Sequence, residues 1–386
     1  MKQQLSSDHS VYFEPLLPWQ QPAWDHLISR YDRLPHGLLF AGMQGIGKRA
    51  FVWRFVAWLL CDNRLQAIGS PNQQGACGHC QSCQWLQSGT HPDLQVLPDS
   101  SLPMMLDSED KEATKKSKGT TKKTQKKSDT VSSEPAKTSI KVDEIRDLQP
   151  FISQGSSGRR VCVIDNADMM TVAAANALLK TLEEPREGIH LLLITDWPTK
   201  LLPTIKSRVQ QVAIDHIQRD KVTDYLTNFV KQNNVIPFDN YADNEDSLTA
   251  QIEQVLKLAN GAPLAALDML DSDWYKHRDT WIKVWLALRV GKRSSIAASD
   301  YWQKNLSIDD FIKLSEFMLM DFSRLSLGLD PLQADLNLGG YASITELTLE
   351  RIQQVMGLIE DVKIARYQNV QDKMAYDRLM SSLAAL

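Results

Sequence analysis

Short apolar runs separated by amphipathic stretches fill the first 214 residues of the chain. The runs predict β-strands at Gly37 to Ala41, Asp93 to Leu97, Arg160 to Asp165, His190 to Thr195 and Val209 to Ile214. Strands that alternate with helices are typical of a mostly parallel sheet covered by helices. Between the third and fourth strands, the segment TVAAANALLKTLEEP predicts a helix that Thr171 caps and Pro185 ends.

Beyond Ile214 the apolar positions follow a helical period, and no further strand is predicted. Residues 215–271 predict a small helical domain with a polar loop near Asp239 to Asp246. Residues 272–386 predict a second helical domain, in which apolar residues recur at helical spacing. Examples are Phe311, Leu314, Phe317, Met318 and Phe322. The predicted layout is an α/β domain over residues 1–214 followed by two helical domains.

A polar, lysine-rich insertion interrupts the α/β domain between about residues 102 and 139. It has almost no apolar periodicity and cannot bury enough surface to offset its ordering entropy, so we expect it to be disordered. Residues 111–127 carry eight lysines against one glutamate, a local charge of +7, and the net charge of −4 for the chain leaves −11 on everything else. A uniformly basic groove for nucleic acid is therefore not expected, and the lysine run is read as a solvated linker.

Length and hydropathy narrow the class of protein further. A chain of 386 residues can form two or three domains whose cores need no disulfides. It contains no stretch of about 18 apolar residues and no basic start followed by an apolar run, so neither a membrane span nor secretion is expected. We therefore expect a cytoplasmic protein whose five cysteines are reduced or metal-bound.

Four of the cysteines have the spacing of metal ligands. The segment GACGHCQSCQWL places Cys77, Cys80 and Cys83 in two consecutive C-x-x-C steps, and Cys61 precedes Cys77 by sixteen positions. Four thiolates can surround a tetrahedral Zn²⁺ without leaving an open position, which predicts a structural zinc module over residues 61–83. A cytosolic redox pair and a chance cluster of buried cysteines are the weaker alternatives. His79 falls outside the spacing, and Cys162 is expected in the core.

The segment LLFAGMQGIGKRAF has the order of a phosphate-binding loop, in which a strand leads through Gly42, Gly45 and Gly47 to Lys48 and a helix. The next position normally holds Ser or Thr to bind Mg²⁺, but here it is Arg49.

A second ATPase motif is also altered. The strand VCVID ends in Asp165, but the following Asn166 cannot act as a general base. Lys48 then has two possible roles, weak nucleotide binding or pairing with a nearby carboxylate such as Asp165.

These motifs together resemble a known family. HGLLFAGMQGIGK, the four-cysteine cluster, GTHPDL, NADMMTVAAANALLKTLEEP and LLPTIKSR are similar to the bacterial clamp-loader subunits of the AAA+ superfamily, and most similar to the delta-prime subunits of DNA polymerase III. Apart from the lysine-rich insertion, the resemblance covers the first 214 residues well, and it covers the rest more faintly. It implies a AAA+ P-loop domain over residues 1–214, a helical lid over 215–271 and a helical collar over 272–386. In the collar, Trp281, Trp285 and Leu286 are expected mainly in the hydrophobic core, and only some of the collar's apolar residues are expected to face other subunits.

The resemblance also implies which positions are catalytic in hydrolysing relatives. Arg49 and Asn166 depart from that pattern, and Leu264, within NGAPLAALDML, stands where the family has a phosphate-contacting arginine. Thr195 matches a polar sensor position. With three parts of the apparatus missing, no intrinsic ATPase is expected, and ATP binding at Gly42, Gly45, Gly47, Lys48 and Asp165 is doubtful.

One catalytic group is retained for use by another subunit. Ser207 and Arg208, in TIKSRVQQV, resemble the family's S-R-C motif, with Val209 replacing the cysteine. The resemblance implies that Arg208 acts in trans as an arginine finger in a neighbour's ATP site. It further implies a hetero-pentameric ring with gamma/tau motor subunits and delta. That ring would load the sliding clamp onto primer-template DNA as part of the DNA polymerase III holoenzyme, a DNA-directed DNA polymerase and nucleotidyltransferase complex.

Two rival readings come from other classes. In the first, the chain is an active gamma/tau-like ATPase in which Lys48 and Asp165 act with catalytic residues other than the usual ones. Alternatively, it would be a nucleic-acid-binding module built on the zinc cluster and the lysine-rich insertion.

Overall fold

The computed structural model describes residues 11–64, 75–103, 139–153, 158–214, 217–233, 245–341, 344, 346–366 and 371–386. The chain divides into two compact units, one that extends to Gln218 and one from Arg219 to Leu386. The observed boundary lies four residues beyond the predicted Ile214. Residues 104–138 of the predicted insertion and most of the polar loop near Asp239 lie outside the described residues.

The first unit is built on a five-stranded sheet in the order β2-β3-β4-β1-β5, with every pair parallel. All five predicted strands are confirmed, with small shifts at their ends. Their bounds are β1 Gly37–Ala41, β2 Leu94–Leu97, β3 Arg160–Ile164, β4 Ile189–Thr195 and β5 Gln210–Val212. β1 and β4 are buried along their whole length, which explains why they read as continuous apolar runs rather than alternating ones.

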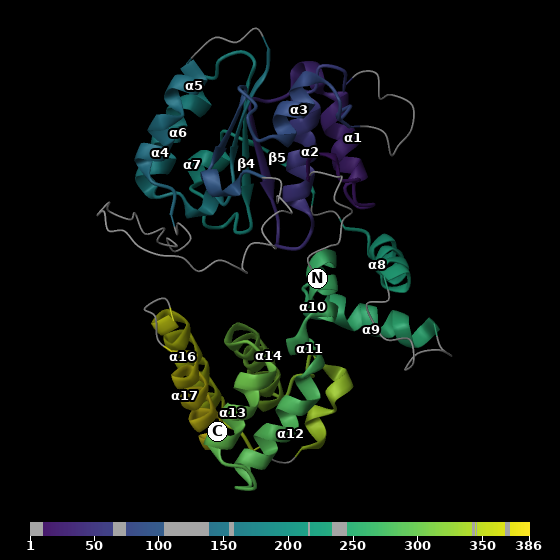
Figure 1. Cartoon of the computed structure of the whole chain (residues 1–386), viewed down its shortest axis with the longest axis vertical. Coiled ribbons are helices and arrows are strands. Elements are labelled where there is room, and N and C mark those ends of the chain that lie inside the picture. Colours follow the sequence, from purple (N-terminus) through teal and green to yellow (C-terminus); the bar gives the residue numbers. More distant parts are fainter. Residues whose placement is uncertain are drawn as a thin grey trace, which may run out of the picture. The chain divides into compact units, whose positions relative to one another are not determined.

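Helices cover both faces of this sheet (Figure 1), with α4 to α6 on one face and α1 to α3 on the other. Their bounds are α1 Gln21–Ser29, α2 Lys48–Leu60, α3 Gln81–Gln87, α4 Val142–Asp147, α5 Gln149–Ser153, α6 Val172–Glu183 and α7 Pro203–Lys206. Leu39 packs with Leu178 and Leu182 of α6, whereas Phe40 contacts Phe51 and Phe55 of α2. The side chains of successive residues of β1 therefore pack on opposite faces of the sheet.

Helix α6 begins and ends where the sequence predicts. The hydroxyl of Thr171 accepts a hydrogen bond from the N–H of Ala174 at 3.2 Å, which satisfies one of the donors that a helix N-terminus leaves unpaired. The helix stops at Glu183, two residues before Pro185. The combination of P-loop order, parallel sheet and covering helices is an α/β fold of the AAA+ type.

The second unit is entirely helical over its described residues. Its helices are α8 Arg219–Asn233, α9 Glu245–Leu258, α10 Pro263–Asp271, α11 Asp273–Lys276, α12 Arg278–Arg289, α13 Ser295–Asn305, α14 Ile308–Ser326, α16 Leu349–Arg366 and α17 Asp372–Ala385. Trp281 and Trp285 are buried against Phe322 of α14, which confirms their expected place in the core. The further boundary predicted near residue 271 falls between α10 and α11 and stays a prediction.

Among the described residues, no helix combines the length and the apolar character that a membrane crossing requires.

Candidate functional site

The candidate nucleotide site lies where three neighbouring strands end. β3, β4 and β1 are adjacent in the sheet, and their carboxyl ends carry Asp165, Thr195 and the loop from Gly42 to Lys48. Ligands of parallel α/β sheets bind at this edge. Within the loop, Gly45 and Gly47 have φ values of 88° and 81°, a left-handed conformation that only glycine adopts readily. The sequence-predicted site residues of this loop and of β3 therefore do come together.

Arg49 fills the position at which a hydroxyl residue would bind Mg²⁺. Its Nε donates to both carboxylate oxygens of Asp165, at 3.0 and 3.1 Å, and its Nη2 donates to Oδ2 of Asp196 at 3.1 Å. Nη2 also donates to the amide oxygen of Asn166 at 2.7 Å. The guanidinium thus bridges the ends of β3 and β4. It occupies carboxylate oxygens that would otherwise be available to bind a metal ion.

Lys48 is buried, with 2% of its side chain exposed, and it pairs with Asp196 rather than with Asp165. Its Nζ also donates to the carbonyl oxygen of Met43 at 3.1 Å. The predicted pairing of Lys48 with a nearby carboxylate is confirmed, but the partner is Asp196 and not the suggested Asp165, whose carboxylate is held by Arg49. Asp196 was missed in the sequence, although its place directly after β4 and next to Thr195 was a usable signal.

Charge in this cluster is balanced among Lys48, Arg49, Asp165 and Asp196. Burial lowers the pKa of Lys48, although Asp196 opposes the change. Burial also disfavours the charged forms of Arg49 and Asp196. Hydrogen bonds to Asp165 and Asp196 nevertheless raise the pKa of Arg49, and hydrogen bonds from Lys48 and Arg49 lower the pKa of Asp196. Two cations and two anions therefore neutralise one another in the loop.

Asn166 has a backbone role in addition to its contact with Arg49. Its φ and ψ are 52° and 47°, in the left-handed region that asparagine tolerates better than most residues. Its N–H donates to Oδ1 of Asp165 at 2.8 Å. Asn166 is thus placed to orient Asp165 and Arg49, and its amide offers no proton acceptor for activating water.

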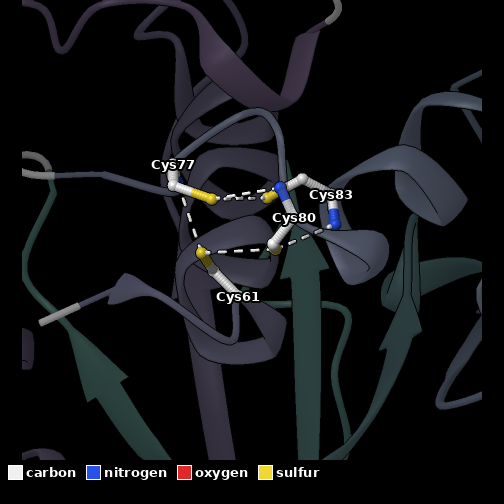
Figure 2. Close-up of side chains that lie close together, drawn as sticks. All are labelled: Cys61, Cys77, Cys80 and Cys83. Carbon is white, nitrogen blue, oxygen red and sulfur yellow. Dashed lines mark hydrogen bonds between the residues drawn. The ribbon is translucent and has the colours of Figure 1, made fainter. Parts of the chain in front are cut away.

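The second candidate site is the four-cysteine cluster (Figure 2). Cys61 follows α2, Cys80 caps α3, and Cys77 and Cys83 complete a group whose sulfurs all lie within 4.8 Å of one another. The Cys61–Cys80 and Cys77–Cys83 sulfur pairs are each 3.9 Å apart. Four metal–thiolate bonds of about 2.3 Å in tetrahedral geometry place their sulfurs about 3.8 Å apart. The cluster therefore fits a metal ion, and it is too open for a disulfide, whose sulfurs are about 2.05 Å apart.

Backbone N–H groups donate hydrogen bonds to sulfurs of this cluster. The N–H groups of Cys77 and Cys80 donate to the sulfurs of Cys61 and Cys77, each at 3.3 Å, and the N–H of Cys83 donates to the sulfur of Cys80 at 3.5 Å. A hydrogen bond from Cys83 lowers the pKa of Cys61 to about 5, and the same contact raises the pKa of Cys83. Four cysteine sulfurs form a donor set that is typical of structural metal sites.

A family model described as DNA polymerase III, delta subunit, matches residues 19–218, just over half of the chain. The chain belongs to this family of DNA polymerase III subunits.

Two of its relatives are delta-prime subunits, and a third is a tau/gamma subunit. The DNA polymerase III subunit delta' of Pseudomonas aeruginosa is 36% identical over 65% of this chain, and the match spans 60% of that protein. The subunit delta' of Haemophilus influenzae is 26% identical over 90% of this chain and 88% of the relative. A DNA polymerase III subunit tau/gamma of the same organism is 27% identical over 62% of this chain and 27% of its own length.

In this member of the family, the predicted arginine finger lies at the surface between α7 and β5. Arg208 has 34% of its side chain exposed and pairs with Glu183 at the end of α6, with its Nη2 2.6 Å from Oε1. Its Nη1 donates to the carbonyl oxygen of Thr204 at 3.0 Å and to the hydroxyl of Ser207 at 3.3 Å. Ser207 and Arg208 thus form one surface cluster with Glu183, which the sequence did not single out.

Thr195 and Leu264, the two other positions matched to the family, lie in different compact units. The hydroxyl of Thr195 donates to Asp168 at 2.6 Å and accepts from the N–H of Trp197 at 3.0 Å, so its single proton is committed within the chain. Leu264 is half-buried at the second position of α10, in the other compact unit.

The GTHPDL motif contributes a buried link that the sequence did not reveal. His91 accepts from the N–H of Asp93 at its Nδ1, at 3.0 Å, which leaves its Nε2 to donate to the hydroxyl of Ser82 at 2.8 Å. Ser82 in turn donates to the carbonyl oxygen of Leu60 at 2.6 Å. Burial lowers the pKa of His91, in keeping with this neutral tautomer. The link joins α3 of the cysteine cluster to the end of α2 and to the start of β2.

The histidine and the cysteine that the sequence places outside the metal-ligand spacing, His79 and Cys162, also lie outside the sulfur cluster. His79 is exposed and bonds to the carbonyl oxygen of Cys77, outside the sulfur cluster. Cys162 is fully buried in β3, where burial raises the pKa of its thiol to about 12.

Proposed function

We propose that this protein is a non-hydrolysing clamp-loader subunit that supplies an arginine finger to a neighbouring ATPase subunit. The observation that carries the first half of the proposal is the position of Arg49. Its guanidinium forms ion pairs with both Asp165 and Asp196, and Lys48 also pairs with Asp196. A nucleotide with Mg²⁺ would have to break this neutral cluster before it could bind.

The other departures act in the same direction. Phosphoryl transfer depends on metal, positioned water and charge stabilisation, and each such group typically contributes several kcal/mol to the transition state. Asn166 offers no base, and Leu264 offers no positive charge. We therefore infer negligible turnover at this site, even if nucleotide enters it.

Arg208 supports the second half of the proposal. It lies on the surface with about a third of its side chain exposed, and it belongs to none of the contacts of the chain's own nucleotide loop. An arginine supplied in trans to a γ-phosphate can raise the rate of hydrolysis by about 10³ to 10⁵. Ser207 would support the same cluster through its contact with Arg208.

The proposed partners follow from the family and from the likeness to tau/gamma. We infer a hetero-pentameric ring of tau/gamma motor subunits, delta and this chain, held together by the C-terminal helical collar. Through that complex the protein would act on the sliding clamp and on primer-template DNA within the DNA polymerase III holoenzyme. Zn²⁺ is the proposed ion of the cysteine cluster, because four thiolates in a closed tetrahedral arrangement suit it best, and its role would be structural.

Reconstitution with the tau/gamma and delta subunits of the same organism tests the proposal. Arg208→Ala should lower DNA-stimulated ATP hydrolysis of the complex by about 10³-fold at the dependent site, whereas Arg186→Ala, which removes an exposed arginine beyond the end of α6, should not. If clamp loading and ATPase activity are indifferent to Arg208→Ala, the trans role is wrong.

The rival reading as a tau/gamma-like ATPase draws support from the retained Lys48. It requires the isolated protein to hydrolyse ATP with Mg²⁺ and to lose that activity on Lys48→Ala. No hydrolysis above background rejects it.

A further inference from the structure

Arg208 is restrained on three sides by groups of its own chain. Nε donates to Oε1 of Glu183 at 2.8 Å, and Nη2 lies 2.6 Å from the same oxygen. Nη1 donates to the carbonyl oxygen of Thr204 in α7. Every nitrogen of the guanidinium therefore has a partner, although an exposed arginine ordinarily samples many rotamers.

The location of Glu183 makes this contact unusual. Glu183 is the last residue of α6, and the exposed Glu184 follows it as the C-cap. Carboxylates at a helix C-terminus are disfavoured by the partial negative charge of the free carbonyl groups. Local helix stability thus gives no reason for an acid at this position. The guanidinium of Arg208 provides the compensating positive charge, and it lies between the C-terminal ends of α6 and α7.

We propose that Glu183 is a positioning residue for Arg208, which fixes the guanidinium in the orientation that reaches the phosphate of a neighbouring subunit. This inference rests on the proposed trans role of Arg208. Oε1 of Glu183 accepts the Nε–H and forms an ion pair with Nη2, so one carboxylate oxygen holds this side of the guanidinium and an N–H of Nη2 remains available for another acceptor.

Orientation, rather than charge, is the property that Glu183 supplies. The pair is partly exposed, with 34% of the Arg208 side chain and 49% of the Glu183 side chain accessible, so solvent screens its charge interaction. A fixed direction is not screened. A misplacement of about 1 Å in a group that contacts the reacting atoms can cost about 10²-fold in rate. The restraint is therefore expected to affect the catalytic rate of the complex and to leave its affinity for ATP unchanged.

Three substitutions in the reconstituted complex test the role of Glu183. Glu183→Ala removes the restraint and should lower kcat of the DNA-stimulated ATPase by about tenfold or more, with KM for ATP unchanged. Glu183→Gln keeps an oxygen that accepts the Nε–H and should stay within about threefold of the wild type. Glu184→Ala removes the same charge from the adjacent exposed position and should behave as the wild type.

A double variant separates positioning from a merely structural effect. If Glu183 acts through Arg208, Glu183→Ala combined with Arg208→Ala should be no slower than Arg208→Ala alone. Size-exclusion chromatography confirms that each variant enters the complex. The inference is overturned if Glu183→Ala matches Glu184→Ala, if it raises kcat, or if the two losses add. An indifferent Arg208→Ala would instead overturn the proposed function itself.

Discussion

At the scale of single residues, Arg49 is the clearest case of a side chain whose meaning depends on its surroundings. In the sequence it is the loss of a Mg²⁺-binding hydroxyl. In the structure it is a cation that bonds to Asp165, Asn166 and Asp196. The loop is therefore closed by its own side chains as well as lacking a ligand.

Arg49→Thr should reopen the loop for Mg²⁺–ATP, because it frees Asp165 and restores a hydroxyl ligand. Its isostere Arg49→Val frees Asp165 without the hydroxyl and is the matched control. Titration calorimetry should show Mg²⁺-dependent ATP binding about tenfold tighter in Arg49→Thr than in Arg49→Val, and no comparable binding by the wild type. Neither variant should hydrolyse ATP, because Asn166 remains.

Both variants should also lose about 1 kcal/mol of unfolding free energy, a modest amount because Arg49 is about a third exposed. Wild-type protein that binds Mg²⁺–ATP as tightly as Arg49→Thr would show that the guanidinium does not close the loop.

At the scale of elements, the ends of helices and strands place the chemistry. β1, β3 and β4 deliver the charged cluster to one edge of the sheet, and the end of α2 meets the start of α3 at the four cysteines. The His91–Ser82–Leu60 link holds α3 against α2 beside that cluster. The cysteine cluster therefore brings the same two helices together at a second point.

Cys80→Ala should abolish metal binding at this junction. Mass spectrometry of purified protein should find about one Zn²⁺ per chain in the wild type and in Cys162→Ala, and almost none in Cys80→Ala. Thermal unfolding of Cys80→Ala should resemble that of chelator-treated wild type, because metal binding stabilises only the folded state. Retention of Zn²⁺ by Cys80→Ala, or its loss from Cys162→Ala, would contradict the assignment of the ligands.

At the scale of the whole molecule, the chain combines an α/β unit with a helical unit, and its strongest positive charge lies between residues 111 and 127. The remainder is acidic, so any affinity of the isolated protein for DNA would have to come from that lysine-rich insertion or from a local patch. This is the point on which a nucleic-acid-binding module and a clamp-loader subunit differ.

Deletion of residues 108–130 should leave the DNA affinity of the isolated protein, and its dependence on salt, unchanged within about twofold. Lysines that neutralise phosphates release counterions, so a binding role would appear as a shallower salt dependence in the deletion variant. Fluorescence anisotropy with primer-template DNA at several salt concentrations measures both quantities. A large loss of affinity with a reduced salt slope would favour the nucleic-acid-binding reading.

The sequence by itself determined the strands, the helix from Val172 to Glu183 and the four members of the cysteine cluster. Strand periodicity, capping chemistry and C-x-x-C spacing are local properties, so they can be read along the chain. The family was also accessible in this way, since its motifs are short and contiguous.

Only the tertiary structure decided which charges meet. Lys48 pairs with Asp196, and Arg208 with Glu183, across sequence separations of 148 and 25 residues. Such pairs depend on the order of strands in the sheet and on the ends of packed helices, which a linear pattern does not encode. The closed state of the loop and the restraint on Arg208 are consequences of that packing.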